Sequence, residues 1–163
     1  MEREHGAIYP GTFDPITFGH LDVIERASRR FTPLVIAVSQ NPGKAPLFTR
    51  DERVRLVSEV VSGLEGVVVE TFDGLLVDFA IDRGIATVVK GLRAVTDFEY
   101  ELQMAQMNHS LKGVETFFMA ATPSHSFLSS SLVKEVARFG GDVDAYVPAE
   151  VARLLKEKYR GEP

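Results

Sequence analysis

The stretch that decides the fold is Gly6-Ala-Ile-Tyr-Pro-Gly-Thr-Phe-Asp-Pro-Ile-Thr-Phe-Gly-His-Leu21. Its first residues, Ala7–Tyr9, are apolar and predict a short buried strand. We expect Pro10 and Gly11 to break this strand, because proline lacks an N–H and glycine tolerates unusual dihedral angles. From Leu21 onward the spacing of apolar residues predicts a helix. A strand, a glycine-containing turn and a helix N-terminus can hold phosphate on backbone N–H groups. This turn is therefore a candidate phosphate site.

His20 stands in the first turn of the predicted helix, where it would lie beside bound phosphate. The alternative is an ordinary strand-to-helix turn in which His20 only caps the helix or packs. The turn contains neither Gly-x-x-x-x-Gly-Lys-Ser/Thr nor Gly-x-Gly-x-x-Gly, the two common phosphate motifs. Thr17-Phe-Gly-His20 instead resembles the T/HxGH signature of the nucleotidyltransferase superfamily. That resemblance implies transfer of a nucleotidyl group from a nucleoside triphosphate, with release of pyrophosphate.

Composition limits the classes of protein to which this chain can belong. The 163 residues are most simply one domain, 1–163, and their 45% hydrophobic content predicts a globular core. There is no cysteine, and the histidines show no metal-ligand spacing, so we expect no metal site built by the protein. The net charge of −5 disfavours a nucleic-acid partner but allows a small polyanionic ligand. Lacking a long apolar run and an apolar leader, the chain is expected to have no membrane span and a cytoplasmic location.

Strand and helix patterns alternate along the chain. Strands are predicted at 7–9, 34–38, 67–69, 87–89 and 115–121, and helices from 21 and at 49–64, 75–83, 98–112, 129–138 and 149–159. This alternation predicts an α/β fold, a doubly wound, Rossmann-like five-stranded parallel sheet with helices on both faces. Thr49 and Glu52 predict a capping box, and Gly84 predicts a helix end. In the helix at 98–112 the residues expected to face the core are Leu102, Met104, Ala105 and Leu111.

Ligands of such sheets lie beyond the carboxyl ends of the strands. The chemically rich segments follow predicted strands there, at 12–20, 44, 90–93 and 124–131. Lys90-Gly-Leu-Arg93 places two cations around a glycine, which suits phosphate, although a solvated basic loop has the same composition. Of the three serines at 129–131, one would suffice as an N-cap, and the others could donate to a triphosphate. Considered alone, Lys44 is most simply an exposed surface lysine.

Three longer motifs stand in order along the chain. Residues 9–20 are Tyr-Pro-Gly-Thr-Phe-Asp-Pro-Ile-Thr-Phe-Gly-His, residues 90–101 contain Lys-Gly-Leu-Arg and Asp-Phe-Glu-Tyr-Glu, and residues 126–135 are Ser-Phe-Leu-Ser-Ser-Ser-Leu-Val-Lys-Glu. Together they resemble the bacterial phosphopantetheine adenylyltransferases over nearly the whole chain. The resemblance implies that ATP and 4′-phosphopantetheine give dephospho-coenzyme A and pyrophosphate, the penultimate step of coenzyme A biosynthesis. It also implies Mg²⁺ held mainly by the substrate phosphates, a homohexamer, and coenzyme A as an inhibitor.

Carried over by position, the resemblance implies three sets of site residues. The catalytic set is His20, Lys44, Thr12 and Arg93. The acceptor would meet Thr12, Lys44, Leu76 and Lys90. The ATP site would consist of Thr12, Phe13, His20, Gly91, Leu92, Arg93, Glu101, His125, Ser126, Phe127, Leu128, Ser129, Ser130 and Ser131. Two positions depart from the family, because position 90 is arginine in many members and position 125 is tryptophan or tyrosine in some. Lysine at position 90 keeps the charge but loses the two-pronged donor geometry of arginine.

The expected chemistry assigns a role to each member of the catalytic set. The acceptor phosphate is ionised near neutral pH and needs no strong base, so alignment and stabilisation of charge matter most. We expect His20 to contact the transition state, Thr12 and Lys44 to orient the nucleophile, and Arg93 with the serines at 129–131 to hold the triphosphate.

Three alternatives remain open. One is a nucleotidyltransferase that acts on nicotinamide mononucleotide or glycerol phosphate. Another is a non-catalytic sensor of nucleotide or coenzyme A, against which the joint presence of Thr12, His20, Lys44 and Arg93 argues. A tRNA-synthetase fragment shares a related histidine signature, but the chain is short and acidic for a tRNA-binding enzyme.

Overall fold

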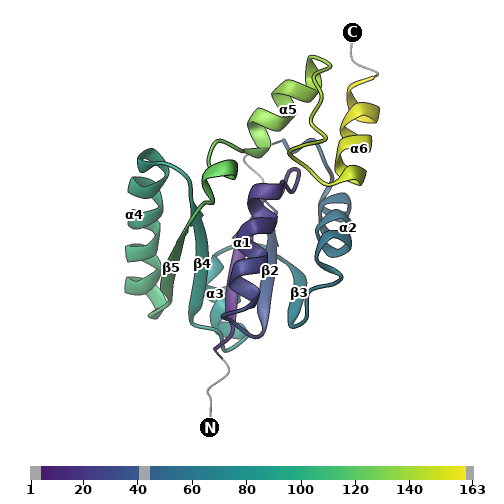
Figure 1. Cartoon of the computed structure of the whole chain (residues 1–163). Coiled ribbons are helices and arrows are strands. Elements are labelled where there is room, and N and C mark those ends of the chain that lie inside the picture. The colour runs from purple at the N-terminus through teal and green to yellow at the C-terminus, as the bar shows by residue number, and fades with distance from the viewer. Residues whose placement is uncertain (1–4, 41–44, 161–163) are drawn as a thin grey trace.

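The computed structural model describes residues 5–40 and 45–160. It shows a five-stranded parallel sheet of order β3-β2-β1-β4-β5 with helices on both faces, so the predicted fold class is confirmed (Figure 1). The elements are β1 (Ala7–Gly11), α1 (Phe18–Ser28), β2 (Leu34–Ser39), α2 (Arg50–Val61), β3 (Val67–Phe72), α3 (Leu76–Asp82), β4 (Thr87–Leu92), α4 (Val95–Lys112), β5 (Glu115–Ala120), the 3-10 turn η1 (Pro123–His125), α5 (Ser130–Arg138) and α6 (Ala149–Tyr159). In the described part of the chain, every helix is too short or too polar to cross a membrane.

Alternate residues of each strand build the two faces of the sheet. Tyr9 and Ile36 lie opposite one another in β1 and β2 and belong to the larger core cluster, which α1 and α2 cover. Their neighbours Ile8 and Val35 point to the other face and pack with Val77 of α3 in a smaller cluster. The continuous apolar runs predicted for the strands thus arise because helices cover both faces.

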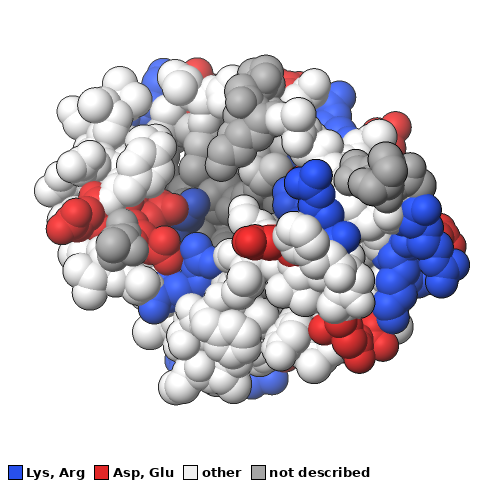
Figure 2. Space-filling model, turned by 90° about the horizontal axis from the view of Figure 1, so that it is seen from above, with Lys and Arg blue, Asp and Glu red and all other residues white. Residues whose placement is uncertain are grey.

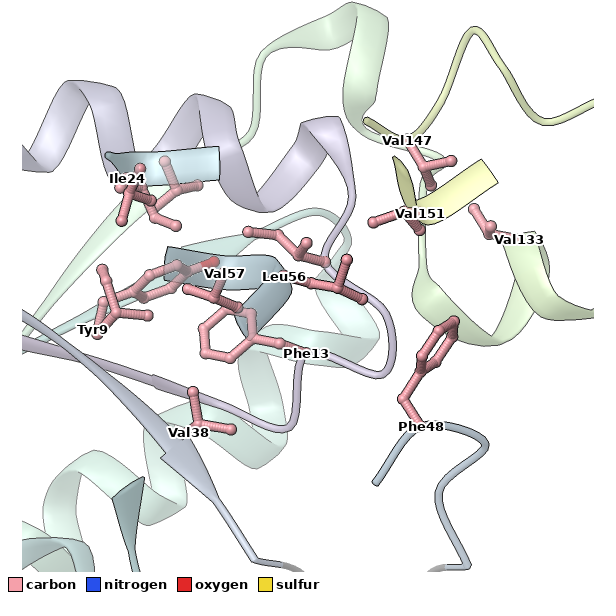
Figure 3. Close-up of a cluster of buried hydrophobic side chains, with 14 of the residues drawn as sticks. Tyr9, Phe13, Ile24, Val38, Phe48, Leu56, Val57, Val133, Val147 and Val151 are labelled. Carbon is pink, nitrogen blue, oxygen red and sulfur yellow. The ribbon is translucent and has the colours of Figure 1, made fainter. Parts of the chain in front are cut away.

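The larger cluster continues beyond the sheet into the C-terminal part of the chain. Phe48, whose side chain is fully buried, lies close to Val133 of α5 and Val151 of α6 (Figure 3). α6 is tied to α2 by an ion pair in which Lys158 Nζ lies 2.9 Å from a carboxylate oxygen of Glu52. α5 and α6 therefore lie at the end of the sheet where the strands finish, with α5 at the top and α6 directly above α2 in the view of Figure 1.

The first strand is longer than predicted, because Pro10 and Gly11 do not break it. They pair in register with Ala37 and Val38 of β2. The register with β4 contains only Ile8, so the later residues of β1 are paired in register with β2 and not with β4. A proline without an N–H is tolerated at such a position because no hydrogen bond to a second neighbour is lost.

Two helices begin earlier than the apolar pattern indicated. α1 begins at Phe18 rather than Leu21, because Thr17 is its N-cap. α4 begins at Val95 rather than Phe98. Helix starts are set by which residue can satisfy the first N–H groups, and apolar spacing reports this poorly.

Other predicted helix ends are confirmed. Thr49 and Glu52 form the expected capping box at the start of α2, with Glu52 Oε2 accepting the Thr49 N–H at 2.8 Å. Gly84 follows the last residues of α3 with a positive φ of 66°, which a glycine adopts without strain.

The orientation predicted for α4 is wrong for three residues, which are exposed: Leu102, Met104 and Leu111. Ala105 is partly buried as expected, and Asn108, three positions further on, is 8% exposed. Apolar residues occur on several sides of this helix, so their spacing does not identify the side that packs on the sheet.

Candidate active site

A cavity of about 500 Å³ opens at the carboxyl ends of β1 and β4. Its wall is formed by the turn after β1, the start of α1, the end of β4, the start of α5, one residue of α4 and the two residues 45–46. Seen from above, cationic and acidic side chains lie near one another around the middle of this face (Figure 2). The cavity therefore lies at the edge of the sheet where the sequence placed the ligand.

The start of α1 holds His20 in a capping box. The hydroxyl oxygen of Thr17 accepts the His20 N–H at 3.4 Å, and Nδ1 of His20 accepts the Thr17 N–H at 3.0 Å. Histidine thus occupies the third helical position, where glutamate or glutamine usually completes the box. His20 therefore does cap the helix, as the structural alternative expected. The same contacts fix its ring in the cavity wall.

The same hydrogen bond determines the tautomer of His20. A backbone N–H can only donate, so Nδ1 carries no proton and the neutral ring is protonated on Nε2. Burial lowers the pKa of His20 to about 4, and the positive charges of Arg93 and Lys90 act in the same direction. At neutral pH His20 is therefore an uncharged side chain with one N–H to donate.

An aromatic group supports the ring of His20 from behind. Phe13 is 2% exposed, and its ring lies edge-on to His20 at 5.1 Å and to Tyr9 at 5.6 Å between centroids. Gly11 makes this packing possible, since a Cβ at that position would lie 2.9 Å from the Phe13 ring. Burial raises the pKa of Tyr9, so its hydroxyl stays protonated.

Two cationic side chains, Lys90 and Arg93, lie at the carboxyl end of β4, the strand beside β1. Lys90 Nζ lies 3.2 Å from a carboxylate oxygen of Glu101, and Arg93 Nε lies 3.2 Å from one of Asp97. Arg93 also donates from Nη1 to the carbonyl of Leu128 at 2.7 Å. These contacts hold the end of β4 against α4 and the connection to α5. Each cation has more donors than these contacts use, which leaves capacity for an anionic ligand.

The three serines do different things. Ser129 is the N-cap of α5, and its hydroxyl accepts the Leu132 N–H at 3.0 Å. Ser130 donates its hydroxyl to the carbonyl of Pro15 at 2.7 Å, which ties α5 to the turn after β1. Ser131 lies in the cavity wall. The N-terminus of α5 thus faces the cavity, and backbone N–H groups at such a position bind phosphate.

These groups come from separate parts of the chain and surround one cavity. An uncharged N–H donor, two cations and a helix N-terminus together suit a ligand with several phosphate groups, because each stabilises negative charge from a different side.

Comparison with known proteins relates most of this chain to one family. The cytidylyltransferase-like family matches residues 8–136. The phosphopantetheine adenylyltransferase of Frankia alni is 58% identical over 156 residues, which cover 93% of this chain and 96% of that protein. The enzyme of the same name from Frankia casuarinae has the same identity and coverage.

The chain belongs to the phosphopantetheine adenylyltransferase family. A solved structure of a protein assigned as a nicotinate-nucleotide adenylyltransferase from Vibrio parahaemolyticus superposes with a TM-score of 0.67. It is 22% identical and covers 98% of this chain and 97% of its own, so this likeness shows the fold alone.

The cavity collects most of the residues that the family resemblance implied. Its wall contains Thr12, Phe13, His20, Lys90, Gly91, Arg93, Glu101, His125, Leu128, Ser129, Ser130 and Ser131. It does not contain Leu76, Leu92, Ser126 or Phe127. Leu76 packs against the smaller core cluster, Ser126 donates to a carbonyl within its own turn, and Phe127 is 55% exposed. Lys44 lies outside the described residues. Lining a cavity is not a ligand contact, so the contacts assigned to all of these residues stay predictions.

One of the two departures from the family pattern leaves an unusual group in the wall. His125 lies in η1, and its Nδ1 is buried with no hydrogen-bond partner among the described residues. A buried polar atom of this kind is costly unless a ligand or water satisfies it. His125 lines the cavity, and its contact with the nucleotide stays a prediction.

Three charged residues near the site were assigned no role from the sequence, namely Arg53, Asp14 and Lys134. Arg53 is 2% exposed and donates from Nη1 to the carbonyls of Thr12 at 2.7 Å and Ser39 at 2.8 Å. It holds the end of β2 against the turn that carries Thr12. The signal in the sequence that could have identified Arg53 was an arginine on the buried face of α2.

Asp14 and Lys134 line the cavity, and the Lys134 ammonium lies 2.6 Å from a carboxylate oxygen of Asp14.

The carboxylates in the cavity wall do not form a metal cage. Asp14 is paired with Lys134 at 2.6 Å, and Glu101 is paired with Lys90 at 3.2 Å. Among residues 5–40 and 45–160, no three side chains of the metal-binding types lie close enough together to hold an ion. The described side chains by themselves therefore do not fit a metal, whose ligands would have to come mainly from bound phosphates.

We expect His20 to remain neutral, with its proton on Nε2, down to about pH 5 in the ligand-free protein. The pKa of about 4 and the Thr17 N–H donated to Nδ1 both require this. Nitrogen-15 NMR of the histidine ring, followed from pH 8 to pH 4, measures both properties, with the spectrum of His20→Gln identifying the resonances. An inflection near the ordinary value of about 6.5, or a proton on Nδ1, contradicts this assignment.

Proposed function

We propose that the chain transfers the adenylyl group of ATP to 4′-phosphopantetheine, giving dephospho-coenzyme A and pyrophosphate. The observation that carries the proposal is the position of His20, a neutral N–H donor that faces a cavity shared with Lys90, Arg93 and the start of α5. The 58% identity to phosphopantetheine adenylyltransferases over 93% of the chain supports this choice of reaction.

The reaction needs alignment and charge stabilisation more than proton transfer. An oxygen of the 4′-phosphate attacks the α-phosphorus of ATP, and the bond from that phosphorus to the bridging oxygen of the β-phosphate breaks. The phosphate monoester is already an anion near neutral pH, so no strong base is required. The obstacles are the repulsion between two polyanions and the negative charge that builds on the α-phosphoryl oxygens and on pyrophosphate.

His20 meets the second obstacle by donating Nε2–H to the α-phosphoryl oxygens. A neutral imidazole suits this role because it donates without giving up its proton at the reaction pH. The capping box holds the ring before substrate binds, so little reorganisation is needed in the transition state.

The cations and the N-terminus of α5 serve the triphosphate. Lys90 and Arg93 are paired with Glu101 and Asp97, and phosphate oxygens would share or replace these carboxylates as partners. The N–H groups at the start of α5 would bind the β- and γ-phosphates, which leave as pyrophosphate. Arg93 is already held by the carbonyl of Leu128, so its guanidinium is positioned before ATP arrives.

The acceptor side rests on fewer described residues. Thr12 lies in the wall of the cavity, and its carbonyl is held by Arg53. We assign Thr12 and Lys44 to the phosphate of phosphopantetheine, and Lys90 and Leu76 to the remainder of that ligand, by their match to the family motifs.

The proposal includes three further elements implied by family membership. Mg²⁺ would neutralise phosphate charge and would be held mainly by the substrates, since Asp14 and Glu101 are already paired. The assembly would be a homohexamer, which sedimentation velocity tests at micromolar concentration. Coenzyme A would inhibit by competing for the acceptor site, and its effect on the acceptor KM tests this. The cytoplasmic location expected from the sequence belongs to the same proposal.

Pyrophosphate release from ATP in the presence of Mg²⁺ should depend on the acceptor. A coupled pyrophosphate assay with 4′-phosphopantetheine measures it, and nicotinamide mononucleotide and glycerol phosphate serve as comparison acceptors. Binding of ATP without pyrophosphate release would indicate a sensor, and faster release with another acceptor would indicate a different member of the superfamily.

His20→Ala should lower kcat by roughly 10²- to 10³-fold, as expected for loss of one donor to a transition state. ATP affinity measured by calorimetry should change little. The matched control is Glu52→Ala, which removes the same capping position from α2, away from the cavity. A kcat of His20→Ala that is as close to wild type as that of the control would make His20 purely structural.

Lys44→Ala should raise the KM for phosphopantetheine while leaving the affinity for ATP nearly unchanged. A hydrogen bond to a charged group contributes roughly 1.5–3 kcal/mol, which corresponds to about a 10- to 100-fold loss in kcat/KM for the acceptor. Saturation curves for each substrate measure the effect, with the exposed Lys156→Ala on α6 as control. A defect confined to ATP would reverse the assignment of Lys44.

A further inference from the structure

The carboxylate of Asp14, in the turn after β1, receives donors from two distant segments. Its Oδ1 accepts the Phe48 N–H at 2.8 Å, and its Oδ2 accepts the Leu47 N–H at 3.0 Å. Lys134 of α5 donates from Nζ to Oδ2 at 2.6 Å. The side chain of Asp14 is only 6% exposed, so these partners replace water around the charge.

The two segments that meet at Asp14 form different parts of the cavity wall. Ala45 and Pro46, which directly precede Leu47, form one part of the cavity wall. The start of α5 lines another part through the serines at 129–131 and Lys134. Ser130 adds a second link from α5 to the same turn through the carbonyl of Pro15. Asp14 is thus the point at which these two parts of the wall are joined.

Buried apolar side chains lie on both sides of this junction. Phe48 has no exposed surface, and it belongs to the same core cluster as Val133, the residue before Lys134 (Figure 3). A change in the position of α5 would therefore disturb both the ion pair and the packing around Phe48. A well-packed interior responds to such a change by shifting its neighbours, since it contains little empty space.

The chemistry of the three donors requires a carboxylate. An asparagine side chain has one oxygen that accepts and one NH₂ group that only donates. With asparagine at position 14, the NH₂ group would therefore face another donor, either a backbone N–H or the Lys134 ammonium. Removing Lys134 would leave a largely buried negative charge without its closest cation. Among the described residues, Arg53 is a further cation that interacts with Asp14, but it already donates to three backbone carbonyls.

We infer that Asp14 and Lys134 act as a positioning pair for the proposed adenylyl transfer, on which this inference rests. The pair holds the segment at residues 45–48 and the N-terminus of α5 at the separation needed for acceptor and triphosphate to align. Lys134 acts through Asp14 and is not a direct ligand of the triphosphate. Its ammonium lies 2.6 Å from a carboxylate that is itself fixed by two backbone N–H groups.

The test uses the full-length chain with Asp14→Asn, Lys134→Met and the double variant. We expect each single variant to lower kcat by roughly 10- to 100-fold, since small misplacements of reacting groups have effects of this size. ATP affinity by calorimetry should stay within about 2-fold of wild type, because binding does not depend on alignment with the acceptor. The double variant should be no slower than the slower single variant, as expected for residues that act as a unit. Lys134→Arg, which keeps the charge, should recover most of the rate.

Matched controls come from an exposed pair of the same chemistry. Lys156 Nζ lies 3.0 Å from a carboxylate oxygen of Asp144, and both side chains are largely exposed. Asp144→Asn and Lys156→Met should leave kcat unchanged. Circular dichroism and thermal unfolding give the folded fraction of each variant, to which every rate is normalised. If Asp14→Asn does not fold, Lys134→Met still tests the inference, because the side chain of Lys134 is 25% exposed, compared with 6% for Asp14.

Four results would overturn the inference. The first is that Asp14→Asn and Lys134→Met have the same kcat per folded molecule as the wild-type protein. The second is weakened ATP binding in Lys134→Met alone, which would make Lys134 a triphosphate ligand. The third is multiplication of the two single effects in the double variant. Absence of acceptor-dependent pyrophosphate release by wild type would overturn the proposed function and this inference together, whereas normal release with unaffected variants would overturn only the role of the pair.

Discussion

At the point where β1 turns into α1, the Thr17 N–H donates to Nδ1 of His20 across 3.0 Å. This bond satisfies the N–H of the N-cap residue, holds the imidazole in the cavity wall and leaves the ring proton on Nε2. The neighbouring structure supports it, since Phe13 packs against the ring and Gly11 leaves room for Phe13. A structural cap and a candidate catalytic donor are therefore the same side chain.

The chain as a whole is acidic, yet its cavity is suited to polyanions. The net charge is −5, but Lys90 and Arg93 stand together at the end of β4. Their carboxylate partners, Glu101 and Asp97, keep this local positive charge in place without fully consuming its donors. Local arrangement of charge, not its sum, determines what such a cavity can bind, because screening limits the reach of distant charges.

Much of the fold could be predicted because its signals are local. Alternating apolar strands and helices indicated the parallel sheet, and Thr49 with Glu52 indicated the start of α2 correctly. The errors arose where a neighbour decides the outcome. Pro10 remains within β1 because it is paired in register with β2 and not with β4, so its missing N–H costs no bond to a second strand. The buried side of α4 depends on how the helix lies on the sheet, which its own apolar residues do not specify.

The sequence by itself determined the alternation of strands and helices, the capping box of Thr49 and Glu52, and the order of the segments at the ligand edge. These depend on residues a few positions apart, whose geometry the backbone dictates. The tertiary structure alone decided the low pKa of His20, the grip of Arg53 on the carbonyls of Thr12 and Ser39, and the contact of Asp14 with Lys134. Asp14 and Lys134 are 120 residues apart in the chain, and no local pattern encodes their meeting. Such contacts exist only once the packing of α5 and the segment around Phe48 has excluded water from the carboxylate, because burial is what makes each partner necessary.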